Sequence, residues 1–228
     1  METQAYSADR AEYSGERVGE IVEASTTRFR AVSVRAFEPP AFGSFVRSVS
    51  TDRVTYGVVS HVAHGSTDPS RRAIPLGRTW EELVAEHPQV FDLLQTEFEA
   101  ITVAFCPNGG EVHGFLPPVP PRVHDFVTLC ADHEIRALTA DLSFVRTLGA
   151  SGLPVTGELL AAAIRGAAAA REDGRSFLLR AGREVADLYR SDYEQACAVL
   201  RRLGMRIAGD DFERRVPEAV AVRRSSAK

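Results

Sequence analysis

The side chains that could carry metal chemistry gather near the middle of the chain. Two cysteines and three histidines lie within one segment: Cys106, His113, His124, Cys130 and His133. Thiolates and imidazoles are the usual ligands of zinc, but structural zinc sites are built from close pairs such as CxxC or HxxxH. None of these spacings supplies such a pair. We therefore expect no metal site, and we interpret the three histidines as residues of a hairpin, a linker and a helix start.

The same region also contains carboxylates that a magnesium-dependent nuclease could use: Asp125, Asp132, Glu134 and Asp141. That chemistry requires carboxylates held together in a rigid site. Glu134 and Asp141 instead fit the solvated side of an amphipathic helix. We interpret the group as solvent-facing charges.

Motifs for nucleophilic or nucleotide chemistry are missing from the printed sequence. The serines considered, Ser66, Ser70 and Ser151, lack the context of a nucleophile elbow. The glycine-rich runs at 108–110 and 149–152 are not followed by the Lys-Ser/Thr of a phosphate-binding loop. We expect a protein that is not an enzyme, with no catalytic residue and no cofactor.

Basic residues offer a candidate interaction surface. The chain carries a formal net charge of −4, which argues against a globally basic nucleic-acid binder. Local clusters remain at Arg71 and Arg72 and in the arginine pairs near the C-terminus, and we add Arg47 to the candidate surface. A barrel that binds single strands also needs aromatic residues on an open face. The barrel's aromatic residues lie in strands where core packing explains them: Phe29, Phe45, Tyr56 and Phe105. We therefore interpret the arginine clusters as solvated charges.

The elements that would position these residues begin with a small barrel. Residues 15–64 contain four short apolar runs rich in Val, Phe and Thr, separated by turn residues. This pattern predicts antiparallel strands at 18–24, 27–36, 44–49 and 55–63.

A helical insertion is predicted at 79–98. Thr79 and Glu82 form a capping box, and Pro88 suits the first turn of a further helix. Residues 100–105 return to strand character, and Asn108-Gly109 predicts a hairpin with a returning strand at 111–116. This strand would complete a barrel of about six strands. The proline-rich stretch 117–123 is then a stiff linker.

The period of the apolar residues changes to that of a helix after the linker. Ile135, Leu138, Leu142 and Val145 form one stripe, and three further helices are expected downstream, two of them capped by Thr156 and by Ser191 with Glu194. The fold class is therefore α+β: a disordered arm (1–14), a barrel with a helical insertion (15–116), a linker (117–123), a helical domain (124–207) and a disordered charged tail (208–228).

Compartment follows from the cysteines and from hydropathy. Three cysteines without a CxxC pair, and no N-terminal segment that combines a basic start with an apolar run, predict a reducing, cytoplasmic setting. The longest apolar runs fall well short of the ~20 residues that cross a bilayer, so no membrane partner is expected.

The first half resembles the HAS barrel, the domain shared by the HerA family of DNA-translocating ATPases and the head subunits of rotary ATP synthases. The resemblance lies in residues 19–22 (GEIV), 42–47 (FGSFVR) and 56–59 (YGVV), and it covers about residues 15–116. In that family the barrel is an assembly module: neighbouring barrels pack into a ring, and the barrel end resembles a docking face for a nuclease. The resemblance implies a barrel without the ATPase domain.

The sequence leaves three hypotheses for function, and for the third, a hydrolase with an undetected site, it offers no candidate residue. In the first, the protein is a non-catalytic adaptor or assembly module that engages a HerA-like ATPase or its partner nuclease in DNA processing, with homo-oligomers possible. In the second, the barrel binds single-stranded nucleic acid, and binding weakens steeply with salt because neutralised phosphates release counterions.

Overall fold

A computed structural model describes residues 16–68, 70 and 74–205. It contains a closed, fully antiparallel barrel of six strands with the order β1-β2-β5-β4-β3-β6. The strands are β1 (Arg17–Ala24), β2 (Arg28–Ser33), β3 (Phe45–Val49), β4 (Arg53–Ser66), β5 (Leu94–Pro107) and β6 (Phe126–Leu129). The α+β class and the six-stranded barrel are confirmed. The expected arm (1–14), the expected tail (208–228) and the pair Arg71 and Arg72 lie outside the described residues.

Alternation of side chains along the strands fills the barrel. Its interior cluster is formed by Ile21, Phe29, Ala31, Val46, Val59, Phe98, Ala100 and Val127. Gly57 belongs to this packing, because a Cβ there would lie 3.0 Å from the Phe29 ring. The glycine therefore provides the space in which Phe29 fills the barrel.

The strand that closes the barrel is not the one that the sequence predicts. Residues 111–116 form only an isolated bridge from His113 to Phe105, and β6 instead pairs with both β1 and β3. The barrel therefore continues past residue 116, and the predicted domain boundary at 117–123 is wrong. Prolines at 117, 118, 120 and 121 lack the amide donors of a ladder, whereas the four residues of β6 keep theirs.

The predicted helical insertion is shorter than 79–98. Helix α1 (Trp80–Glu86) begins at the predicted capping box of Thr79 and Glu82, and the 3₁₀ helix η2 (Pro88–Leu93) follows. Residues 94–98 belong to β5, with Thr96 and Phe98 buried. A spacing of four between Leu94 and Phe98 satisfies a strand as well as a helix, which is why the pattern misled the prediction.

Up to residue 205, where the described part of the chain ends, five helices follow the barrel: α2 (Asp132–Leu138), α3 (Ser143–Gly149), α4 (Thr156–Ala169), α5 (Gly174–Leu188) and α6 (Tyr193–Arg202). The stripe predicted as one helix from Asp132 is split into α2 and α3, because Leu142 adopts a left-handed conformation with φ of 59°. The predicted caps also differ: Asp192, not Ser191, accepts from the backbone N–H of Gln195 at the start of α6, and Val155 is the N-cap of α4 while the Thr156 hydroxyl donates to the Leu153 carbonyl.

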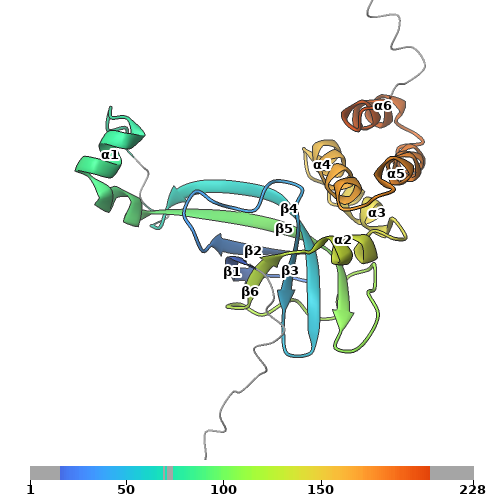
Figure 1. Ribbon diagram of the computed structural model, residues 1–228, viewed down its shortest axis with the longest axis horizontal. Coiled ribbons are helices and arrows are strands. Elements are labelled where there is room, and N and C mark those ends of the chain that lie inside the picture. The colour runs from blue at the N-terminus through green and yellow to red at the C-terminus, as the bar shows by residue number, and fades with distance from the viewer. Residues whose placement is uncertain (1–15, 69, 71–73, 206–228) are drawn as a thin grey trace, which may run out of the picture.

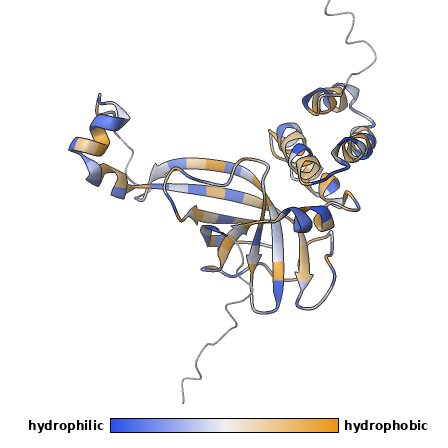
Figure 2. Ribbon diagram, in the orientation of Figure 1, coloured by the Kyte–Doolittle hydropathy of each residue, from blue (hydrophilic) through white to orange (hydrophobic). Residues whose placement is uncertain are grey.

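These five helices, here called the helical layer, pack on one side of the barrel: α3 contacts β5, and α4 to α6 pack around α3 and on one another (Figure 1). Phe45 of β3 meets Phe144 of α3 edge to face, with ring centroids 5.7 Å apart. Outward side chains of β3, β4 and β5 share one buried cluster with α3 to α6, and Figure 2 shows apolar residues striping these helices. Because residues 55–60 of β4 and 100–105 of β5 are buried on both faces, the barrel and the helical layer share one packed core.

Candidate interaction surface

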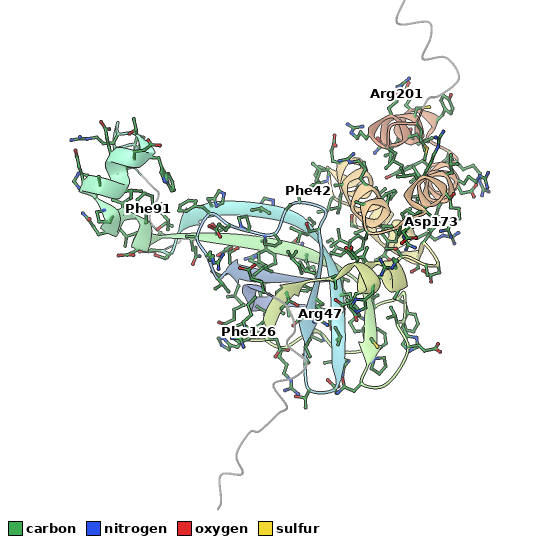
Figure 3. The ribbon with its side chains drawn as sticks, viewed as in Figure 1. Phe42, Arg47, Phe91, Phe126, Asp173 and Arg201 are labelled. Atoms are coloured by element: carbon green, nitrogen blue, oxygen red, sulfur yellow. The ribbon has the colours of Figure 1, made fainter. Side chains whose placement is uncertain are left out.

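Arg47 does not lie on an open surface. Its side chain is 14% exposed and lies beneath α2, where Nη1 donates to Glu134 Oε1 at 2.8 Å and Nε donates to Thr128 Oγ1 at 3.2 Å (Figure 3). Glu134 Oε2 accepts from the backbone N–H of Ala131 at 2.8 Å. The prediction that Glu134 is solvated is wrong: it is buried in an ion pair that fastens the first helix of the helical layer to β3.

Two weakly acidic side chains, the Cys130 thiol and the Tyr56 hydroxyl, lie near this ion pair. Burial raises the pKa of the Cys130 thiol well above its usual value, and the Glu134 carboxylate raises it further. Burial and the same carboxylate also raise the pKa of the Tyr56 hydroxyl. Both groups therefore stay protonated at neutral pH, which is the opposite of an activated nucleophile.

The remaining candidate metal ligands have separate partners. The His113 ring packs at a tilt against Phe105 and Phe115, with its centroid 5.2 Å from each of theirs, and His124 pairs with Glu20 at 2.6 Å. Asp125 accepts from Ser50, and Asp141 accepts from the backbone N–H of Ser143. Within residues 16–68, 70 and 74–205, no group of three or more His, Cys, Asp or Glu could hold a metal ion.

Sequence reasoning missed a two-stranded ribbon that projects from the barrel. Beyond its pairing with β2 and β3, the β4·β5 pair continues as a two-stranded ribbon, from His64 opposite Thr96 to Ser66 opposite Leu94. The ribbon carries α1 and η2, here called the cap (80–93), away from the barrel (Figure 1). Neither α1 nor η2 has a buried residue.

An aromatic cluster ties the cap to the barrel. The Phe37 ring lies 5.0 Å from Trp80, 6.3 Å from Phe91 and 5.2 Å from His64, measured between ring centroids. The backbone N–H of Phe37 donates to Thr96 Oγ1 at 2.9 Å, and the same oxygen lies 2.8 Å from His64 Nδ1. Phe37 holds φ at 67°, which is unusual for a residue with a large side chain. Only the helix-like spacing around Trp80 could have hinted at this cluster.

Apolar side chains are exposed to solvent in the cap and in residues 74–79, which lead into it. The exposed fractions are 79% for Ile74, 50% for Leu76, 52% for Trp80, 52% for Val84 and 57% for Leu93. Four carboxylates accompany them: Glu81, Glu82, Glu86 and Asp92. Arg78 pairs with Glu86 at 2.9 Å. An exposed apolar group rimmed by charge is typical of a protein-binding surface.

The outer face of β1 and β2 has a different character. Arg28 pairs with Glu99 at 3.5 Å, Arg30 with Glu23 at 3.2 Å, and Arg35 with Glu16 at 3.1 Å. These guanidinium groups are matched by carboxylates rather than gathered into a positive groove. Such a face lacks the electrostatic footprint of nucleic-acid binding.

Comparisons with protein-family models and with curated proteins find no match to this chain. None of the helices in the described part of the chain is both long and apolar enough to span a bilayer.

Proposed function

We propose that the protein is a non-catalytic adaptor or assembly module, that its barrel is of the HAS type, and that it engages a HerA-like DNA-translocating ATPase or the nuclease that works with one. The support is a closed six-stranded barrel at the residues that carry the resemblance, together with the cap.

The cap is the observation that carries this proposal. A helix of seven residues is marginal in water by itself, and helices in proteins are stabilised mainly by the apolar face that they bury. α1 buries no residue, while Trp80 and Val84 remain about half exposed. A partner protein that covers these side chains would supply the missing burial. Because the helical layer already covers the outer face of β3 to β5, the cap is the surface that we assign to partner binding.

Affinity purification from the native host tests the proposal. The tagged full-length chain should bring down a HerA-like ATPase or its nuclease, identified by mass spectrometry. A Val84→Glu, Leu93→Glu variant should lose them, since both side chains are exposed and the changes leave the barrel core untouched. Purification without any such ATPase or nuclease would count against the adaptor function.

Single-strand binding is the competing hypothesis, and titration across a salt series separates it from the adaptor. The carboxylates of the cap and the paired arginines of β2 disfavour contact with phosphates. We expect no saturable binding of single-stranded DNA at low salt. Affinity that falls steeply as salt rises would favour the nucleic-acid function instead.

A further inference from the structure

One edge of the β4·β5 ribbon has no strand beside it among the described residues. β3 pairs with β4 only as far as Val58, and the loop before β3 adds Val59, whose N–H donates to the Ser44 carbonyl at 3.0 Å. From His61 to Ser66, β4 pairs with β5 alone. This part of β4 lies in the ribbon, which projects away from the barrel and from the helical layer (Figure 1).

The hydrogen bonds of the ribbon decide which backbone groups point toward that edge. In an antiparallel pair, residues that bond to the neighbouring strand alternate with residues whose N–H and C=O point to the other side. At the end of the ribbon, the Thr67 N–H donates to the Leu93 carbonyl at 2.9 Å. The register has no shift in this part of β4, so the N–H and C=O groups of Val62, His64 and Ser66 point away from β5.

The residues of this edge lack the usual protection against pairing. Natural edge strands carry charged side chains, lysine above all, or proline, or a bulge that disrupts the edge. Residues 61–66 read HVAHGS, without Lys, Arg, Asp, Glu or Pro, and the nearest bulge precedes them. Four of the six are exposed: His61, Ala63, His64 and Gly65. Such an edge accepts a further strand, whose main chain supplies the hydrogen bonds.

A second copy of this chain supplies a strand that fits the edge. When two copies lie antiparallel about a two-fold axis at His64, the outward groups of Val62 face those of Ser66 in the other copy, and His64 faces its counterpart. All three outward residues of each copy then form hydrogen-bonded pairs. Residues 61–66 carry no charge while their histidines are neutral, so the pairing brings no like charges together.

We propose that two copies of this chain pair antiparallel through residues 61–66 of β4 and form a two-fold dimer. Both copies use the same edge, so the assembly closes at two. The inference does not depend on the proposed function, because the pairing uses the main chain of the ribbon, whereas partner binding is assigned to side chains of the cap.

Sedimentation velocity of the purified full chain tests the proposal, and we expect a dimer at about 100 μM that dissociates on dilution. Ala63 faces Gly65 of the other copy in this pairing. Ala63→Lys with Gly65→Lys brings like charges together twice and should weaken the dimer about tenfold. The matched control, Ala63→Lys with Gly65→Glu, places opposite charges there and should dimerise at least as well as the unmodified chain. A Cβ at residue 65 has open space around it, so the ribbon accommodates either change.

Hydrogen exchange of the unmodified chain locates the interface without any variant. Amides of residues 61–66 should exchange more slowly at about 100 μM than at about 1 μM, because pairing protects those that point outward. A chain that stays monomeric at about 100 μM would overturn the proposal. Equal effects of the two double variants on dimerisation would also overturn it, as would a dimer in which exchange of residues 61–66 does not change with concentration.

Discussion

At the scale of single residues, Arg47 and Glu134 form a buried ion pair, whereas the sequence predicted an exposed arginine and a solvated carboxylate. Both side chains are at least 86% buried by their exposed fractions of 14% and 9%. Removing one partner of such a pair leaves a buried charge without compensation. Arg47→Met and Glu134→Gln should each lower the free energy of unfolding by roughly 3–5 kcal/mol, measured by urea denaturation.

An exposed pair of the same chemistry provides the control. Arg30 and Glu23 lie 3.2 Å apart with side chains 45% and 68% exposed. Arg30→Met should cost less than about 1 kcal/mol. Equal costs at Arg30 and Arg47 would contradict a structural role for the buried pair.

Cys130 and Tyr56 predict a loss of stability in alkali. Their usual pKa values are 9.0 and 10.0, and burial raises both in the folded chain. As the pH rises past about 9, the unfolded chain releases protons that the folded chain retains, so the free energy of unfolding falls. Urea midpoints at pH 8 and pH 10 measure this fall.

Cys130→Ala should reduce the difference in urea midpoint between the two pH values, because it removes one of the groups whose pKa burial raises. A midpoint that is equally sensitive to alkali in Cys130→Ala and in a Tyr56→Phe, Cys130→Ala double variant would contradict the assignment.

At the scale of elements, the contact between α4 and the loop before β3 depends on Gly43. Its φ is +84°, and a Cβ there would lie 2.4 Å from the Ala162 Cβ. Gly43→Ala combines backbone strain with a clash against α4, and it should destabilise by about 3 kcal/mol. Gly109 has a similar φ of +70° and open space around it, so Gly109→Ala should cost only about 1 kcal/mol. Equal losses on thermal unfolding would mean that the contact with Ala162 contributes nothing.

We expect Phe37 to hold the cap in its position on the ribbon, through its ring contacts with Trp80 and Phe91. Trp80 is the single tryptophan of the chain, so its fluorescence reports on the cap alone. Phe37→Ala removes the ring that contacts Trp80 and Phe91 and should shift the emission to longer wavelength. Phe115→Ala removes a ring of the separate cluster around His113 and should leave the emission unchanged. An unchanged spectrum in Phe37→Ala would show that the ribbon alone positions Trp80.

The sequence predicted those elements whose apolar pattern is long and unambiguous. Strands β1 to β4 and helix α1 lie close to their predicted positions, because alternation and a capping box are local signals. β6 has four residues beside a proline-rich stretch, so no periodicity marks it. Partners distant in sequence, such as Arg47 with Glu134 and Phe37 with Trp80, depend on tertiary packing that one-dimensional patterns do not record.

At the scale of the whole molecule, the barrel and the helical layer bury part of each other's surface, while the β4·β5 ribbon and the cap extend beyond them (Figure 1). The outward side chains of β3, β4 and β5 are buried against the helical layer. The described surface that stays exposed includes the apolar side chains and carboxylates of the cap and the charge-paired face of β1 and β2. The proposed adaptor function rests on this division of surfaces.

The most direct test of the adaptor function is a binding titration between the purified full chain and a purified HerA-like ATPase, or its nuclease, from the same host. We expect a dissociation constant in the range of about 1 μM or tighter, weakened at least about tenfold by Val84→Glu, Leu93→Glu in the cap. Val155→Glu, Leu179→Glu places the same charges on exposed positions of the helical layer and should bind like the unmodified chain. Absence of binding at about 100 μM, or equal weakening by both variants, would contradict the account.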